Sequence, residues 1–149
     1  MGLFDALDIS GSGLAAQRLR MDVTAENLAN AQTTKGADGQ PYRRKEVVLR
    51  EISQGGAFGA QLTAAMGSGS KTRPGGVEVA EIANDQTAGK MVYDPSHPDA
   101  NAQGYVQMPN VDTVTEMVDL IDSSRAYEAN VTAMQASKQM FTKTLELLK

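Results

Sequence analysis

The chain has 149 residues, a formal net charge of −4 and no cysteine. This length fits one domain carrying a small insert, and so mild a charge argues against a general nucleic-acid-binding surface. The lack of cysteine excludes disulfide bonds, thiolate catalysis and cysteine-bound metals, and an aromatic content of 5% argues weakly against a compact enzyme core.

The N-terminal segment is predicted to be a helix because apolar residues repeat every seven positions. Within it, Gly11 and Gly13 each weaken a helix by about 1 kcal/mol. They predict either a break or a point where a neighbouring segment packs too tightly for a side chain. The apolar row consists of Leu7, Leu14, Met21 and Leu28.

The sequence ENLANAQTTKG follows at positions 26–36. Its short amide and hydroxyl side chains compete for backbone hydrogen bonds, so they favour caps and turns over helix interiors. A catalytic loop, a ligand clamp and a fixed structural corner each use this chemistry, and the segment alone leaves all three open.

The middle of the chain is predicted to be rich in β-structure. Short β-branched segments indicate strands, and residues 53–76 read as a glycine-rich loop. Residues 93–104, with two prolines around His97, are predicted to form turns. The predicted strands lie at 43–52, 75–82, 90–94 and 104–108.

The C-terminal forty residues are predicted to form one long helix. Asn110 is a candidate N-cap, and Thr113 with Glu116 offers an alternative capping box. Two rows with a seven-residue spacing indicate a coiled-coil-like seam, and the shorter N-terminal helix cannot cover it alone. The first row is Leu120, Tyr127, Met134, Phe141 and Leu148. The second contains Met117, Val131 and Leu145, interrupted by Ser124 and Lys138.

The predicted fold class is therefore α+β, with long terminal helices forming a coiled-coil-like pair and a small β-rich insert between them. We expect a helical domain from residues 1–32 and 109–149, and an insert spanning 33–108. The N-terminus lacks a cleavable signal sequence, and no apolar run reaches the length of a membrane span.

Patterns that could carry chemistry each have a simpler interpretation. His97 has only two nearby carboxylates for a metal site, so a solvated turn is favoured. GSGLAA at 11–16 imitates part of a dinucleotide motif, but no strand precedes it. YRRKE at 42–46 could touch phosphate, yet it has no second basic cluster, and Tyr127 with Met134 reads as packing rather than a cofactor site. The sequence predicts no catalytic residues, cofactor or metal.

Several segments resemble the FlgC family of flagellar proximal-rod proteins. ENLANAQTT at 26–34 resembles the Ala-Asn-x-x-Thr motif of flagellar axial proteins. DGQPYRRKEVV at 38–48, KMVYDP at 90–95 and GYVQMPNVD at 104–112 are similar to the FlgC branch. The late Gly36 and Tyr42 also resemble this branch, since rod and hook relatives usually place Gly-Tyr closer to the threonine.

The resemblance implies a structural subunit of the basal-body rod and no enzymatic activity. Its terminal helices would form an inner tube that transmits torque and walls the export channel. Expected partners are further copies of the chain, rod proteins of the FlgB and FlgF types, the adaptor FliE and the flagellar type III export apparatus. The expected location is the rod in the periplasm, reached without a cleaved signal peptide.

Under this resemblance, the polar segment becomes a fixed corner formed by Asn27, Asn30, Thr33, Gly36 and Tyr42. The apolar rows become subunit-packing residues. The alternative function is a secreted coiled-coil adaptor that docks on a single partner, and an enzyme has almost no support.

Overall fold

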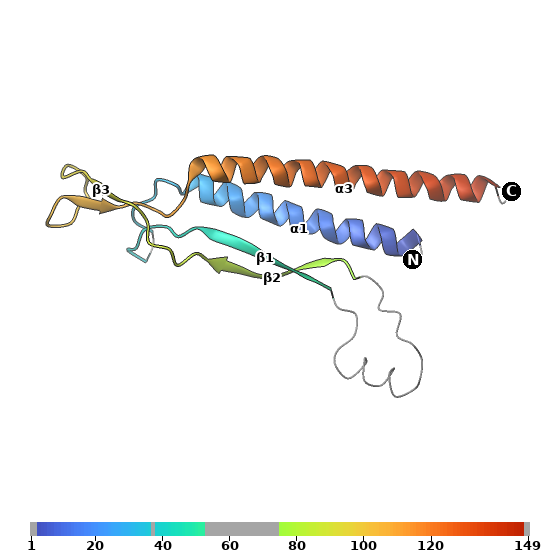
Figure 1. The fold of residues 1–149 in the computed structure, drawn as a ribbon, viewed down its shortest axis with the longest axis horizontal. Coiled ribbons are helices and arrows are strands. Elements are labelled where there is room, and N and C mark those ends of the chain that lie inside the picture. The colour runs from blue at the N-terminus through green and yellow to red at the C-terminus, as the bar shows by residue number, and fades with distance from the viewer. Residues whose placement is uncertain (1–2, 37, 53–74, 148–149) are drawn as a thin grey trace, which may run out of the picture. The chain divides into compact units, whose positions relative to one another are not determined.

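The structure is a computed structural model that describes residues 3–36, 38–52 and 75–147. Helices stand at both ends, with short strands between them, which confirms the predicted α+β class (Figure 1). Most of the predicted glycine-rich loop and Leu148 lie outside the described residues. The elements are α1 (Leu3–Ala29), β1 (Lys45–Glu51), β2 (Val77–Asn84), β3 (Met91–Tyr93), β4 (Tyr105–Gln107) and α3 (Thr113–Leu147).

The chain divides into two compact units. Unit 1 contains residues 1–16, 49–80 and 127–149, and unit 2 contains residues 17–48 and 81–126. Helices α1 and α3 and strands β1 and β2 each contribute residues to both units, so each unit has its own pair of helical segments and its own strand segments.

Helix α1 is continuous through both glycines, so the predicted break is wrong. The alternative prediction, a neighbouring segment packed too closely for a side chain, is confirmed at Gly13 in unit 1. A Cβ atom there would lie 3.2 Å from Nδ2 of Asn130 on α3, whereas one at Gly11 would lie at an ordinary 3.9 Å from Met134. The pairing of 13 with 130 and 11 with 134 makes the two helical segments of unit 1 antiparallel.

The helical segments of unit 2 are also antiparallel. Near the end of α1, Asn27 bonds to Glu116 in the first turn of α3. The side of α1 toward this contact contains buried Val23 and Asn27, and the side of α3 contains buried Glu116 and Ser123. In this unit, α3 therefore contributes buried polar side chains to the contact, whereas α1 contributes one apolar and one polar side chain.

Helix α3 begins at Thr113, and its cap is Asp112. The Asp112 carboxylate accepts hydrogen bonds from the Val114 amide at 3.1 Å and the Thr115 hydroxyl at 3.3 Å. These bonds satisfy the first turn, which otherwise has amide groups without partners. The predictions of an Asn110 cap and of a Thr113–Glu116 capping box are therefore wrong, because Asp112 occupies that role.

The strands form two separate two-stranded sheets. Strand β1 runs antiparallel to β2: the Asp85 amide bonds to the Arg44 carbonyl in unit 2, and the Ile52 amide bonds to the Gly76 carbonyl in unit 1. Strands β3 and β4 pair antiparallel, with Val92 opposite Val106.

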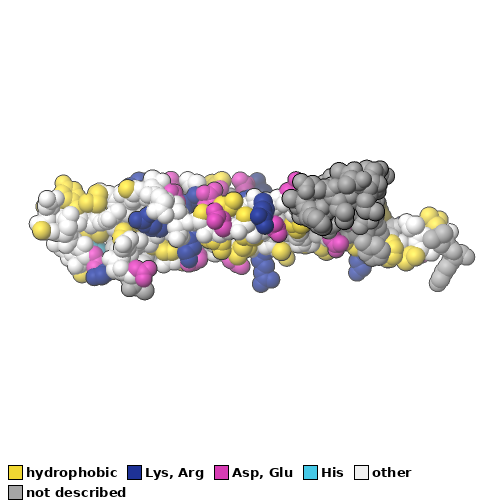
Figure 2. Space-filling view, turned by 90° about the horizontal axis from the view of Figure 1, so that it is seen from below, with side chains coloured by type: hydrophobic (Ala, Val, Ile, Leu, Met, Phe, Trp, Pro, Cys, Tyr) yellow, Lys and Arg dark blue, Asp and Glu magenta, His cyan; other side chains and the backbone are white. Residues whose placement is uncertain are grey.

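The β3–β4 sheet is small but has its own packing. Val106 is 2% exposed, whereas Tyr93 and Tyr105 remain exposed and meet edge to face at 5.2 Å. Apolar side chains gather over these strands (Figure 2). Gly104 has a φ of 79°, and this left-handed conformation suits glycine at the turn before β4. None of the described helices combines the length and apolarity needed to cross a bilayer.

Candidate functional site: a polar joint

Asn27 joins three elements of unit 2 through one side chain. Its Nδ2 donates to the Lys45 carbonyl at 2.9 Å and to Oε2 of Glu116 at 3.0 Å. Its Oδ1 accepts from the Lys45 amide and from the Tyr42 hydroxyl, both at 2.9 Å. An asparagine amide has two donor hydrogens and two acceptor lone pairs, and all four are used. Asn27 is 1% exposed, so α1 is tied to β1 and to α3 through a fully satisfied buried group.

The two bonds to Lys45 also complete the edge of a strand. Lys45 is the first residue of β1, and its amide and carbonyl both bond to Asn27 instead of to another strand. A side-chain amide has the same donor and acceptor groups as a peptide unit, so Asn27 occupies the place of a neighbouring strand at this point. The start of β1 is thereby fixed against α1.

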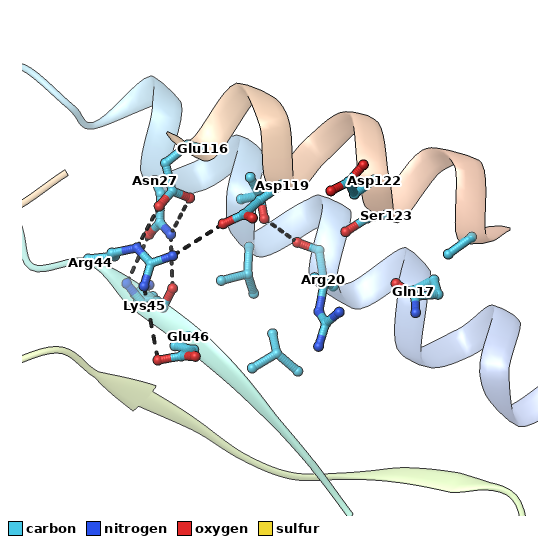
Figure 3. A pocket seen from close by; sticks show the side chains of 14 residues that line it. Gln17, Arg20, Asn27, Arg44, Lys45, Glu46, Glu116, Asp119, Asp122 and Ser123 are labelled. Carbon is cyan, nitrogen blue, oxygen red and sulfur yellow. Dashed lines mark hydrogen bonds and ion pairs between the residues drawn. The ribbon is translucent and has the colours of Figure 1, made fainter. Parts of the chain in front are cut away.

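Glu116 is the buried charge of this cluster. It is 1% exposed, and its Oε1 accepts from Nε of Arg44 at 2.5 Å while its Oε2 accepts from Asn27 (Figure 3). A buried carboxylate needs both an opposite charge and hydrogen bonds to offset the loss of water. Glu116 has both, because Arg44 supplies the charge and Asn27 the second bond.

Arg44 extends the cluster along α3 and β1. Its NH2 group lies 3.4 Å from Asp119, and NH1 lies 4.0 Å from Glu46. The hydrogen bond to the Glu116 carboxylate is the largest influence on Arg44 and raises its pKa. Partial burial acts in the opposite direction, and the charges of Glu116, Glu46 and Asp119 add smaller upward contributions. Arg44 therefore stays charged and connects strand β1 to the first two turns of α3.

Tyr42 and Asn110 close the cluster from the loops. Burial, with the nearby charges of Glu26 and Glu116, raises the pKa of Tyr42 to about 12, so its hydroxyl remains a donor to Asn27. Oδ1 of Asn110 accepts from the Arg44 amide at 2.8 Å. We call the cluster the joint, which comprises Asn27, Tyr42, Arg44, Lys45, Asn110 and Glu116.

The end of α1 is fixed by local bonds rather than by a glycine. Nδ2 of Asn30 donates to the Glu26 carbonyl at 2.9 Å, and the Thr33 hydroxyl donates to Oδ1 of Asn30 at 3.2 Å. The Tyr42 amide then bonds to the Thr33 carbonyl, and the Gly36 amide to the Gln40 carbonyl. Of the five predicted corner residues, Asn30, Thr33, Gly36 and Tyr42 therefore lie in the hydrogen-bonded segment that follows α1, whereas Asn27 lies in the last turn of α1. Only Asn27 and Tyr42 belong to the joint.

A groove of about 480 Å³ runs beside the joint in unit 2. Side chains of α1, β1 and α3 line it, including Arg20, Asp122 and Ser123 (Figure 3). The buried Oε1 of Gln17 also lines it and has no hydrogen-bond partner among the described residues. The groove is polar and of mixed charge. Over the described ranges, no three acidic or histidine side chains come together as a metal site requires.

The other residues that the sequence offered as possible ligand sites lie in ordinary helix and turn positions. GSGLAA at 11–16 lies inside α1, so it is not the strand-to-helix turn of a dinucleotide site. Nδ1 of His97 accepts from the Asp99 amide at 3.1 Å, within a turn. Asp99 in turn accepts from the Thr34 hydroxyl at 2.8 Å, which ties this turn to the corner segment.

The predicted subunit-packing residues are only partly covered. Those on α1 with described side chains are half-buried, as are four on α3. Three on α3 are exposed, and Leu148 lies outside the described residues. The half-buried residues are Leu7, Leu14, Met21, Leu28, Leu120, Tyr127, Val131 and Met134, and the exposed ones are Met117, Phe141 and Leu145.

Four members of the joint were missed because each has a local interpretation in the sequence. Glu116 suggests a capping box and Asn110 a helix cap, while Arg44 and Lys45 belong to a basic segment whose phosphate-binding interpretation is not favoured. A signal was nevertheless present on α3, where a polar row repeats every seven residues and is buried or half-buried throughout. Its members are Glu116, Ser123, Asn130 and Ser137.

Comparisons with known proteins agree on one family. Residues 7–37 match the family described as flagella basal body rod protein, and residues 102–147 match the C-terminal family of flagellar basal body rod FlgEFG proteins. The matched regions therefore contain most of α1 and the whole of β4 and α3.

Relatives that align over nearly the whole chain identify the branch of the rod proteins to which it belongs. The chain is 52% identical to the flagellar basal-body rod protein FlgC of Bacillus subtilis, with 99% of each chain covered. It is 46% identical to FlgC of Escherichia coli O157:H7, over 99% of this chain and 98% of the relative. FlgC of Aquifex aeolicus is 38% identical, over 100% and 99%. With such identity along its entire length, the chain belongs to the FlgC family of flagellar basal-body rod proteins, and it is a structural subunit of that rod.

Proposed function

We propose that this chain serves in the proximal rod as a non-enzymatic subunit whose joint holds the β-rich insert at a fixed angle to the helices. The observation that carries this proposal is the complete hydrogen bonding of Asn27, which connects α1, β1 and α3 within unit 2. A fully satisfied buried polar network has essentially one low-energy arrangement. A shaft under torque needs such a connection, because a loose hinge would let the helices turn without the insert.

We further propose that the subunit assembles through its terminal helices. Residues 1–32 and 109–149 would form the tube and export-channel wall, and residues 33–108 the outer insert. Partly covered apolar side chains on both helices support this, because other chains can supply the cover that the described residues leave incomplete. The neighbours would be further copies, FlgB-type and FlgF-type rod proteins and, at the base, FliE.

The proposed route and location follow from this assembly. The chain would leave the cytoplasm through the flagellar type III export apparatus, without a cleaved signal, and be added to the rod in the periplasm. Cells that lack a working export apparatus should then retain the full-length chain in the cytoplasm. Export at the normal level in such cells would contradict this route.

The test of the joint compares Asn27→Ala with Asn30→Ala. The first change leaves the Lys45 amide and carbonyl and the Tyr42 hydroxyl without partners. These groups are only partly buried, so each lost bond should cost about 0.5–1.5 kcal/mol. The second removes only bonds at the exposed end of α1 and should cost about 1 kcal/mol. We expect Asn27→Ala to reduce swimming strongly, and Asn30→Ala to reduce it little.

Immunolabelling of isolated basal bodies separates assembly from rigidity. The Asn27→Ala chain should reach the rod in reduced amount, or reach it and transmit torque poorly. Normal swimming of cells whose only copy is Asn27→Ala would contradict the proposed role of the joint. Absence of the unaltered chain from basal bodies would contradict its place in the rod altogether.

A further inference from the structure

Helix α3 exposes an apolar stripe in unit 2 that the described part of the chain leaves uncovered. Four large side chains share one face of its first turns: Val114, Met117, Val118 and Ile121. Their spacing of three, four and seven residues places them on a single side of the helix. They are 66%, 47%, 52% and 52% exposed, respectively. Ile121 is the last residue of the stripe, and Arg125 follows it one turn further along the same face of the helix.

This stripe lies on the side of α3 that points away from α1. The buried side of the same segment contains Glu116 and Ser123. At 100° per residue, the centre of the stripe lies roughly 170° around the helix from these two residues. A surface helix normally turns its apolar side toward the core, and here the polar residues occupy that side. The stripe is therefore available to another molecule.

Helix α1 has an outer face of complementary shape in the same unit. Arg18, Asp22, Ala25 and Ala29 are all exposed and recur at intervals of four, three and four residues. This face is opposite the buried Val23 and Asn27. The two alanines leave it thin, so that large side chains of another helix can approach the backbone closely.

We propose that the C-terminal half of the α3 stripe, Val118 and Ile121, docks together with Arg125, antiparallel, on the outer face of α1 in a second copy of this chain. This rests on the proposed role as a rod subunit and names the two surfaces that neighbouring copies share. Val118 and Arg125 are seven residues apart, as are Ala29 and Asp22. In the antiparallel register that sets Val118 against Ala29, Ile121 lies opposite position 26, within one residue of Ala25. Val114 and Met117 then extend beyond the last residue of α1.

Charge selects this direction. The antiparallel register brings Arg125 to Asp22, and neither side chain makes an ion pair elsewhere in the part of the chain that the structure describes. The parallel alternative with the same overlap would instead set Val118 on Asp22 and bury a carboxylate under an apolar side chain. Charge therefore favours the antiparallel orientation.

The contact is heterologous, because it joins two different faces. Both faces point away from the α1–α3 contact of unit 2, so each copy offers one face to each of two neighbours. Such contacts form closed rings or open helical filaments rather than closed twofold dimers. A shared helical wall built from successive copies follows from this geometry.

Cysteine cross-linking tests the contact in the assembled rod, since the chain contains no cysteine of its own. The full-length variant Ala29→Cys/Val118→Cys is expressed in flagellated cells that lack their own copy, and basal bodies are oxidised after isolation. The matched control is Glu46→Cys/Val118→Cys, because Glu46 is exposed in the same unit but lies on β1. The first variant should give a ladder of chain multimers, and the control should give none.

Each outcome is decisive. Assembled Ala29→Cys/Val118→Cys chains without a ladder, or an equal ladder from the control, would overturn the docking proposal and leave the rod function standing. Absence of the unaltered chain from basal bodies would instead defeat the rod function.

A charge reversal decides the case in which the cysteine variants do not assemble. Asp22→Arg and Arg125→Glu should each lower incorporation into basal bodies several-fold, and the double variant should restore it. Because both residues are exposed and unpaired in the described chain, the free subunits should unfold at the same denaturant concentration as the original. Single variants that incorporate normally, or a double variant no better than the singles, would overturn the proposal.

Discussion

The two contacts between α1 and α3 differ in how they use the same row of α3. In unit 2, Glu116 from the polar row is buried and bonded to Asn27 and Arg44. In unit 1, Asn130 from that row lies against Gly13, where the missing side chain makes room for it. One contact uses hydrogen bonds and charge, and the other uses close approach. The large apolar side chains Val114, Met117, Val118 and Ile121 of α3 take part in neither contact and remain exposed in unit 2.

The comparison predicts that substitutions within the polar row of α3 differ widely in their effect on stability. Glu116→Ala removes the partner of Arg44 and a hydrogen-bond acceptor of Asn27, and breaking a buried pair in this way costs about 3–5 kcal/mol. The matched change Ser137→Ala, three heptads further along, has no bond to remove among the described residues and should cost less than about 0.5 kcal/mol.

Urea unfolding of the two full-length variants, followed by circular dichroism, measures this difference. The slope of the transition should remain constant while its midpoint falls for Glu116→Ala. If both variants unfold at the same urea concentration, the joint contributes no more stability than the rest of the row, and the contrast between the two contacts is lost.

Much of this fold could be predicted from periodicity. The seven-residue spacing from Leu120 through Met134 indicated the long helix, and short β-branched runs indicated the strands. The joint could not be predicted in the same way, because its bonds connect residues 72 and 89 positions apart. Searching for apolar rows also directed attention away from Glu116, since the row that faces α1 is polar. The sequence shows which side chains can form hydrogen bonds or ion pairs, but it does not show which distant residue each one meets.

The contact in unit 1 can be tested by filling the space at Gly13. A Cβ atom there already lies 3.2 Å from Nδ2 of Asn130, so Gly13→Val should overpack the contact and cost about 1–3 kcal/mol. Gly11→Val is the control, because the nearest atom to its Cβ would be Met134 Cε at 3.9 Å. Both changes carry the same helix propensity, so their difference isolates the packing.

Shortening the neighbour provides the rescue. The double variant Gly13→Val/Asn130→Ala should recover most of the stability lost by Gly13→Val, measured by the same urea transitions. A Gly13→Val chain as stable as Gly11→Val would show that α3 is not held close at this point, and the two contacts would no longer differ in the way described.

The smallest expected effect concerns the hydroxyl of Tyr42. Tyr42→Phe removes one of the two donors to Oδ1 of Asn27, while the Lys45 amide remains, so the cost near pH 8 should be about 0.5–1.5 kcal/mol. Burial and the charges of Glu26 and Glu116 raise the pKa of Tyr42 to about 12 from its ordinary 10.0. A group whose pKa is raised by folding contributes stability that is complete below the unfolded pKa and is lost as the pH rises through the folded pKa.

The stability difference between the original chain and Tyr42→Phe should therefore stay constant up to about pH 10 and shrink between pH 10 and 12. Urea transitions of both chains across this range measure it, and subtracting them removes the titration of the lysines. A difference that remains constant to pH 12 would mean that the Tyr42 hydroxyl titrates as it does in water and lies outside the joint.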